Sequence, residues 1–180
     1  TKDKKDFENI SKLIPNKEFR IYYSNDLIGT QIGGALKNIY AIAAGVAEGL
    51  NLGENAKSAL ISRSFAEMTR YAKKFKADKN TLFGLSGLGD LILTCSSKNS
   101  RNTQFGIKLA SSKYDNFLDL LKSQEVTEGY YTVKAVYNIS QKKNIDMPIM
   151  ESVYNILYKQ HDLKEELSNL LSRPITEEKI

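Results

Sequence analysis

The chain has 180 residues, 41% of them hydrophobic and 26% charged, which suits one folded domain with a short appendage. A single cysteine and a single histidine exclude a disulfide within the chain and argue against a zinc site or a Ser-His-Asp triad. The net charge of +5 favours an anionic ligand such as a phosphate or a nucleotide.

The first 27 residues differ in character from the rest of the chain. A short amphipathic helix is predicted over residues 6–13, and residues 18–23 have the aromatic and β-branched content of a strand. No other strand is predicted. Residues 28–180 are therefore expected to form a mainly α, multi-helical domain.

Two long helices are predicted next, over residues 28–50 and 54–76. The first is rich in small residues. The second has apolar residues at spacings near three and four, which predicts one buried face and one solvated face. The charged residues assigned to the solvated face are Lys57, Arg63, Glu67, Arg70 and Lys74.

The remaining segments alternate between loop and helix. Residues 78–99 hold three of the eleven glycines and are predicted to be rich in loops. Further helices are predicted over 100–110, 116–123, 129–142, 148–159 and 163–172. Pro148 suits the first turn of its helix, and Asp162 suits the cap of the last one.

Lys37 is the only charged residue in the segment 33–47, where nearly every other residue is small or apolar. Small residues let other backbone come close and exclude water, and loss of hydration disfavours the charged form of an amine. A lysine that gains and loses a proton near neutrality can act as a general acid or base. The alternative is that Lys37 lies at a helix edge with its ammonium in solvent.

Asp90 ends a glycine-rich segment that begins at Gly84. The order G-x-x-G-x-G after a helix differs from the G-x-G-x-x-G that follows a strand in dinucleotide-binding loops. The segment instead predicts a tight loop that presents the Asp90 carboxylate beside the apolar residues that follow it. The alternative is that Asp90 only caps a helix.

Ser100 and Arg101 mark the start of a predicted helix. Ser100 is a good N-cap, and free amides at a helix start attract anions. An arginine in the first turn opposes the helix dipole unless an anion is present, so this pair predicts a bound phosphate. The alternative is a surface arginine beside a capped helix.

Glu128 lies at the start of another predicted helix. It could cap that helix, accept a hydrogen bond from a ribose hydroxyl, or do neither.

Several motifs occur in a fixed order and together resemble the C-terminal half of bacterial NAD(P)-dependent glycerol-3-phosphate dehydrogenases. The similarity covers about residues 19–157. It implies a helical substrate-binding domain over 28–180, of the type found in 6-phosphogluconate dehydrogenase. Residues 1–27 would be the tail of a Rossmann domain that precedes it. The motifs are Ile32–Asn38, Gly84–Cys95, Ser100–Asn102, Thr127–Gly129 and Met147–Ile149.

The resemblance implies reversible hydride transfer between NAD or NADP and dihydroxyacetone phosphate, which gives sn-glycerol 3-phosphate for glycerophospholipid synthesis without a metal. Lys37 matches the family's catalytic acid and base, and it would also contact the substrate. Asp90, the second catalytic residue, matches the family's substrate aspartate and would bond Lys37 or a substrate hydroxyl. Asn38 is expected to orient Lys37. Without the Rossmann domain, the helical part alone is expected to be inactive.

The remaining site residues also follow from the resemblance. Ser100, Arg101 and Asn102 match the family's substrate-contacting triplet, and phosphate is their natural target. Arg101, Val126 and Glu128 match positions that contact the cofactor.

No signal peptide and no apolar membrane span is visible, so a cytoplasmic protein is expected. A homodimer that does not bind nucleic acid is also expected. Two alternatives remain. One is a related helical-domain dehydrogenase with another phosphorylated or hydroxy-acid substrate. The other is a helical module that binds nucleic acid through a basic surface, although the scattered lysines disfavour it.

Overall fold

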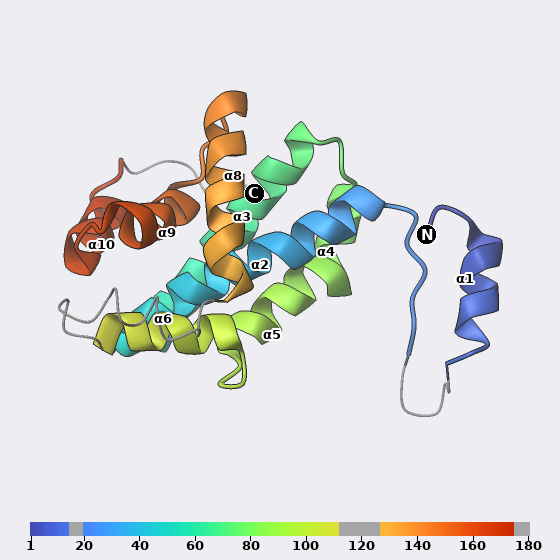
Figure 1. The fold of residues 1–180 in the computed structure, drawn as a ribbon, viewed down its shortest axis with the longest axis horizontal. Helices are drawn as coiled ribbons and strands as arrows, with labels where there is room; N and C mark the ends of the chain where they lie inside the picture. The colour runs from blue at the N-terminus through green and yellow to red at the C-terminus, as the bar shows by residue number, and fades with distance from the viewer. Residues whose placement is uncertain (15–19, 112–126, 175–180) are drawn as a thin grey trace.

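The computed structural model describes residues 1–14, 20–111 and 127–174, and within these ranges all regular secondary structure is helical (Figure 1). This confirms the mainly α prediction. The elements are α1 (Lys4–Ser11), α2 (Leu27–Gly49), α3 (Glu54–Lys74), α4 (Lys79–Phe83), the π-helix η1 (Leu85–Gly89), α5 (Asp90–Ser96), α6 (Arg101–Ser111), α8 (Glu128–Lys143), α9 (Pro148–Lys159) and α10 (Leu163–Leu171).

The predicted strand is not found where the structure describes it. Arg20–Tyr23 have no regular secondary structure, while residues 18 and 19 lie outside the described part of the chain. A strand needs a partner strand to complete its hydrogen bonds, and the described residues offer none. Tyr23 instead packs on Phe7 of α1, with ring centroids 5.3 Å apart, and its hydroxyl donates to the carbonyl of Lys2 at 3.0 Å.

The predicted loop over residues 78–99 is also wrong, because most of this segment is helical. It forms α4, η1 and α5 in succession. The glycines that suggested a loop lie in and around the π-helix, a widened turn that often marks a functional site. The helix predicted over 116–123 falls outside the described residues.

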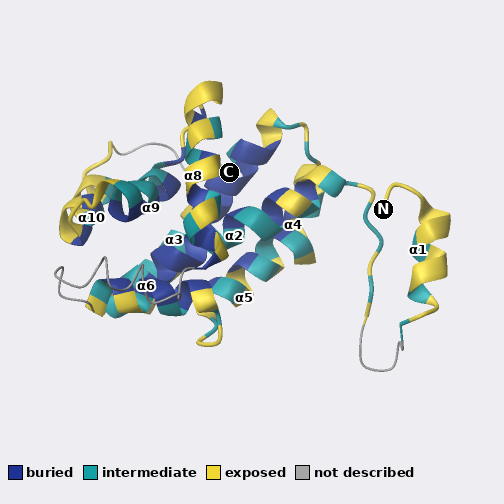
Figure 2. Ribbon diagram, viewed as in Figure 1, coloured by how far each residue is buried: buried dark blue, intermediate teal, exposed yellow. Residues whose placement is uncertain are grey.

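Helix α2 is the centre of the fold, and α3, α5, α6, α8 and α9 all pack against it. Within α2 only Ile28 and Gln31 are exposed, so the helix is drawn mainly in the buried and intermediate colours of Figure 2. Leu36, Ile39 and Tyr40 are almost fully buried. The small residues of its sequence therefore admit neighbours on nearly every side.

The closest of these neighbours is α6. A Cβ atom on Gly45 would lie 2.0 Å from the carbonyl oxygen of Thr103, and one on Gly106 would lie 2.1 Å from that of Ile42. Only glycine allows backbones to come so close. Farther along both helices, a Cβ atom on Gly49 would lie 2.9 Å from the carbonyl oxygen of Ile107. The two helices therefore run in the same direction. The start of α6 is thereby brought beside the middle of α2, where Lys37 lies.

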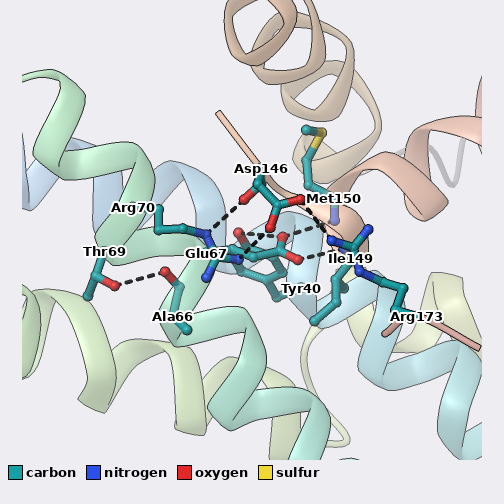
Figure 3. A network of polar contacts seen from close by, with 9 residues as sticks. All are labelled: Tyr40, Ala66, Glu67, Thr69, Arg70, Asp146, Ile149, Met150 and Arg173. Carbon is teal, nitrogen blue, oxygen red and sulfur yellow. Dashed lines mark hydrogen bonds and ion pairs between the residues drawn. The ribbon is translucent and has the colours of Figure 1, made fainter. Parts of the chain in front are cut away.

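Glu67 lies in the core, not on the solvated face of α3 as predicted, and is only 1% exposed. Its carboxylate accepts hydrogen bonds from the backbone N–H of Ile149 at 2.6 Å and of Met150 at 3.1 Å (Figure 3). The Tyr40 hydroxyl donates to it at 3.3 Å. Helix α9 begins after Met147, which offers no capping side chain. Glu67 therefore supplies the cap of α9 from a different helix.

This buried cap makes stability depend on pH. Burial raises the pKa of Glu67 from 4.5 to about 7, although the two amides and nearby Arg70 act in the opposite direction. The folded state therefore binds this proton more tightly than the unfolded state, and stability falls as pH rises from about 4.5 to about 7. A shift of this size corresponds to about 3 kcal/mol.

We expect urea unfolding to show this loss between pH 5 and pH 8, and Glu67→Gln to remove most of it. Glu54→Gln is the matched control, because Glu54 is an exposed residue of the same helix. Equal pH slopes for the wild type and Glu67→Gln would contradict the assignment.

Among the described helices, none has both the length and the apolar character needed to cross a membrane.

Candidate active site

Lys37 and Asp90 form a direct ion pair between α2 and the start of α5. The Lys37 Nζ atom donates to Asp90 Oδ2 at 2.6 Å, and the two side chains are 23% and 31% exposed. The cap position of α5 is held by Gly89, and the Asp90 carboxylate is directed at the lysine. The amine is thus neither free in solvent nor sealed in the core, and a small ligand can reach the pair.

Thr94 supports Asp90 from one turn farther along α5. Its hydroxyl lies 2.6 Å from the Asp90 carbonyl oxygen and 3.4 Å from Asp90 Oδ1. Because the hydroxyl has one proton, the shorter contact to the carbonyl is the hydrogen bond. Thr94 is not among the residues predicted for the site. The spacing of four residues from Asp90, which places both on one helix face, was the available signal.

Arg101 and Glu128 form a second ion pair, between the first turns of α6 and α8. Both side chains are largely exposed, at 75% and 53%. The sequence predicts a bound phosphate beside Arg101. In the structure the guanidinium pairs with the Glu128 carboxylate, and the phosphate stays a prediction. Val126, the third predicted cofactor contact, lies outside the described residues.

Ser100 and Asn102, on either side of Arg101, are engaged within the fold. Ser100 Oγ accepts the backbone N–H of Thr103 at 3.2 Å, which confirms the predicted N-cap. Asn102 is 4% exposed, and its Nδ2 atom donates to Asn38 Oδ1 at 3.1 Å. A primary amide has two N–H groups, so one N–H of Asn102 is left for another acceptor.

The two ion pairs are linked by a side-chain hydrogen bond between α2 and α6. Asn38 directly follows Lys37, Asn102 directly follows Arg101, and the two asparagines are hydrogen-bonded to each other. Asn38 donates to the carbonyl of Gly34 and accepts from Asn102 of α6, and its expected role in orienting Lys37 stays a prediction.

The charged groups at this site suit a nicotinamide dinucleotide and a phosphorylated substrate. A guanidinium at a helix start pairs well with phosphate, and an exposed carboxylate can accept hydrogen bonds from ribose hydroxyls. In the described ranges, no group of three or more His, Cys, Asp or Glu side chains is arranged to hold a metal ion.

In the described residues, helices thus carry a partly exposed lysine–carboxylate pair and an exposed arginine, and such groups suit a small anionic ligand. A family model described as NAD-dependent glycerol-3-phosphate dehydrogenase C-terminus matches residues 26–168. The chain belongs to this family.

Individual relatives agree with this assignment. The chain is 45% identical over 178 residues to a glycerol-3-phosphate dehydrogenase [NAD(P)+] of Solidesulfovibrio magneticus, covering 98% of this chain and 53% of the relative. It is 41% identical to the enzyme of the same name from Staphylococcus haemolyticus, covering 96% of this chain and 52% of the relative. The chain thus spans about half the length of the curated relatives it matches.

Solved structures show the same partial coverage. The glycerol-3-phosphate dehydrogenase of Coxiella burnetii superposes with a TM-score of 0.88 at 36% identity, over 95% of this chain and 52% of that one. The enzyme of Saccharomyces cerevisiae superposes with a TM-score of 0.79 at 28% identity, over 93% of this chain and 49% of that one.

Proposed function

We propose that the protein carrying this chain is an NAD(P)-dependent glycerol-3-phosphate dehydrogenase that interconverts dihydroxyacetone phosphate and sn-glycerol 3-phosphate. The chain would supply the acid–base group and the phosphate site. The observation that carries the proposal is the half-exposed Lys37–Asp90 pair, 2.6 Å apart, in a chain that belongs to this family.

Lys37 is the proposed proton donor. The nicotinamide cofactor, when bound, delivers a hydride to the C2 carbonyl of the substrate, and the oxygen there then needs a proton. An ammonium group has three N–H bonds. Asp90 occupies one of them, which fixes the direction of the amine and leaves two to reach the substrate oxygen. In the reverse direction the neutral amine takes the hydroxyl proton.

Arg101 is the proposed phosphate ligand. Its guanidinium and the first amides of α6 favour a dianion at this point of the fold. Ser100 holds the helix start in place. Asn102 Nδ2 uses one N–H on Asn38, and its second N–H is proposed to donate to a phosphate oxygen. A bound phosphate would replace Glu128 as the partner of Arg101. Together with Val126, Arg101 and Glu128 are the proposed cofactor contacts.

Family membership and the half-length coverage support the remaining parts of the proposal. Residues 1–27 would belong to the domain that binds NAD or NADP, and residues 28–180 would form the substrate domain. The enzyme would be a cytoplasmic homodimer that serves glycerophospholipid synthesis. Sedimentation of the enzyme tests the dimer.

The phosphate assignment is tested by Arg101→Met in the enzyme that carries this chain. We expect KM for dihydroxyacetone phosphate to rise about 30- to 100-fold, because a charge-assisted bidentate contact contributes about 2–3 kcal/mol. Activity with dihydroxyacetone, which lacks the phosphate, should change much less. Arg63→Met, at an exposed arginine of α3, controls for the change in net charge. Equal losses with both substrates would rule out Arg101 as the phosphate ligand.

A further inference from the structure

The buried Glu67 carboxylate of α3 holds the start of α9. Pro148, the first residue of α9, has no N–H, so Ile149 and Met150 carry the first amides of this helix. Both amides donate to Glu67, at 2.6 Å and 3.1 Å. This helix start contains the family motif Met147–Ile149, to which the proposed site gives no role.

Within the described ranges, the hydrogen-bond donors to this carboxylate are neutral groups. Besides the two amides, the Tyr40 hydroxyl of α2 donates to it at 3.3 Å. The nearby Arg70 guanidinium is engaged with Asp146: its Nε atom donates to the Asp146 carbonyl at 2.8 Å, and its ion pair with the Asp146 carboxylate is 3.8 Å long (Figure 3). A buried carboxylate without a paired cation retains a large desolvation cost, so its charged form is disfavoured.

The other titratable and charged groups around Glu67 come from several elements. They are Tyr40 of α2, Arg70 of α3, Cys95 of α5, Asp146 before α9 and Arg173 after α10. Burial raises the pKa of Tyr40 well above its ordinary value and the pKa of Cys95 to about 12, so both stay neutral up to pH 8. Guanidinium groups stay charged over this range, and the exposed Asp146 pairs with both arginines. Among the buried members of this cluster, Glu67 is therefore the group that changes charge between pH 5 and pH 8, because burial raises its pKa to about 7.

We propose that Glu67 is a pH-sensitive latch on α9, which holds the first turn of the helix while it is protonated and lets that turn open once it is charged. A protonated Glu67 still accepts hydrogen bonds and can donate its own proton to the Tyr40 oxygen. A charged Glu67 is better hydrated when the first turn of α9 moves aside and admits water. The latch therefore opens as the pH rises.

The size of the effect follows from the two pKa values of Glu67. In the open state water surrounds the carboxylate and its pKa returns to 4.5, whereas in the closed state it is about 7. The open state therefore loses its proton first, and the ratio of open to closed molecules rises up to tenfold for each pH unit between these values. Between pH 5 and pH 8 this amounts to about 50- to 100-fold.

Hydrogen exchange of the Ile149 and Met150 amides tests the latch in the protein that carries this chain. The rates are corrected for the intrinsic pH dependence of exchange, which leaves the opening constant. We expect this constant to rise about 50- to 100-fold from pH 5 to pH 8 in the wild type and to stay flat in Glu67→Gln. A flat wild type, or an equal rise in Glu67→Gln, would overturn the proposal.

The same experiment separates a local opening from unfolding of the whole domain. Leu36 and Ile39 lie in the fully buried part of α2, at 1% and 0% exposure. We expect their amides to be protected at least about tenfold more strongly than those of Ile149 and Met150. Equal protection would mean that Glu67 meets water only when the domain unfolds, and the latch would not exist.

The start of α10 is the matched control, because an exposed carboxylate caps it. Asp162 accepts the amides of Lys164 and Glu165 at 2.9 Å and 3.0 Å. Their opening constant should stay within about twofold over the same pH range. An equal rise at both helix starts would indicate general loosening and would count against the latch.

Tyr40→Phe keeps the proposal testable if Glu67→Gln fails to fold. The Tyr40 hydroxyl lowers the pKa of Glu67 by bonding its charged form, so its removal should carry the rise in opening to a higher pH. An unshifted rise would show that another group titrates. None of these readouts uses catalytic activity, so the latch and the proposed function stand or fall separately.

Discussion

Replacing Lys37 by methionine is expected to lower turnover of dihydroxyacetone phosphate by about a thousandfold or more with little loss of folding. General acid catalysis contributes about 10²- to 10⁴-fold, and no other side chain hydrogen-bonded to Asp90 in the described structure carries a positive charge. Methionine keeps the length and the apolar stem of lysine, and the site is partly exposed, so stability should change little. The measurement is kcat from cofactor absorbance, beside a thermal melt.

Lys57→Met is the matched control for this substitution. Lys57 also donates to a carboxylate at 2.6 Å, that of Glu48, and it is 12% exposed. The substitution removes the same charge and the same kind of ion pair, but at a place that the proposed mechanism does not use. We expect its turnover to stay within about twofold of wild type. Comparable turnover in Lys37→Met and wild type would remove Lys37 from the mechanism.

Gly106→Ala is expected to cause the largest loss of stability among the single substitutions considered, about 3–5 kcal/mol. The added Cβ would lie 2.1 Å from the carbonyl oxygen of Ile42, which belongs to the backbone of α2 and cannot turn aside. The two helices would have to separate along their whole contact. The gain of about 1 kcal/mol in helix propensity cannot offset that. Urea unfolding measures the difference.

Gly34→Ala serves as the control, because a Cβ atom at Gly34 would have no neighbour within 4 Å. This glycine lies in the same helix as Ile42, and its substitution should leave stability unchanged or raise it by up to about 1 kcal/mol. Equal stability of the two alanine variants would contradict the close helix contact described here.

The sequence predicts best the helices whose ends carry a capping side chain or a proline and whose apolar residues follow a helical spacing. Ser100 and Asp162 cap α6 and α10 through their own side chains, and Pro148 starts α9. The strand over residues 18–23 and the loop over 78–99 were predicted from composition. Composition does not show whether a partner strand is present. It also does not show whether glycines belong to a loop or to a π-helix.

The site shows the same division. The residue types at Lys37 and Arg101 indicated proton transfer and anion binding, and the family motifs joined Lys37 to Asp90. Glu67 was misplaced because periodicity reports only which helix face is mostly apolar. It cannot show that this carboxylate accepts hydrogen bonds from the first amides of α9, 82 residues farther along the chain.

The most direct test of the central claim is a crystal structure of the enzyme carrying this chain, with sn-glycerol 3-phosphate and oxidised cofactor bound. Our account predicts the Lys37 amine within hydrogen-bond distance of the C2 hydroxyl and the phosphate against the Arg101 guanidinium at the start of α6. A phosphate bound elsewhere, with the Lys37 amine remote from C2, would contradict it.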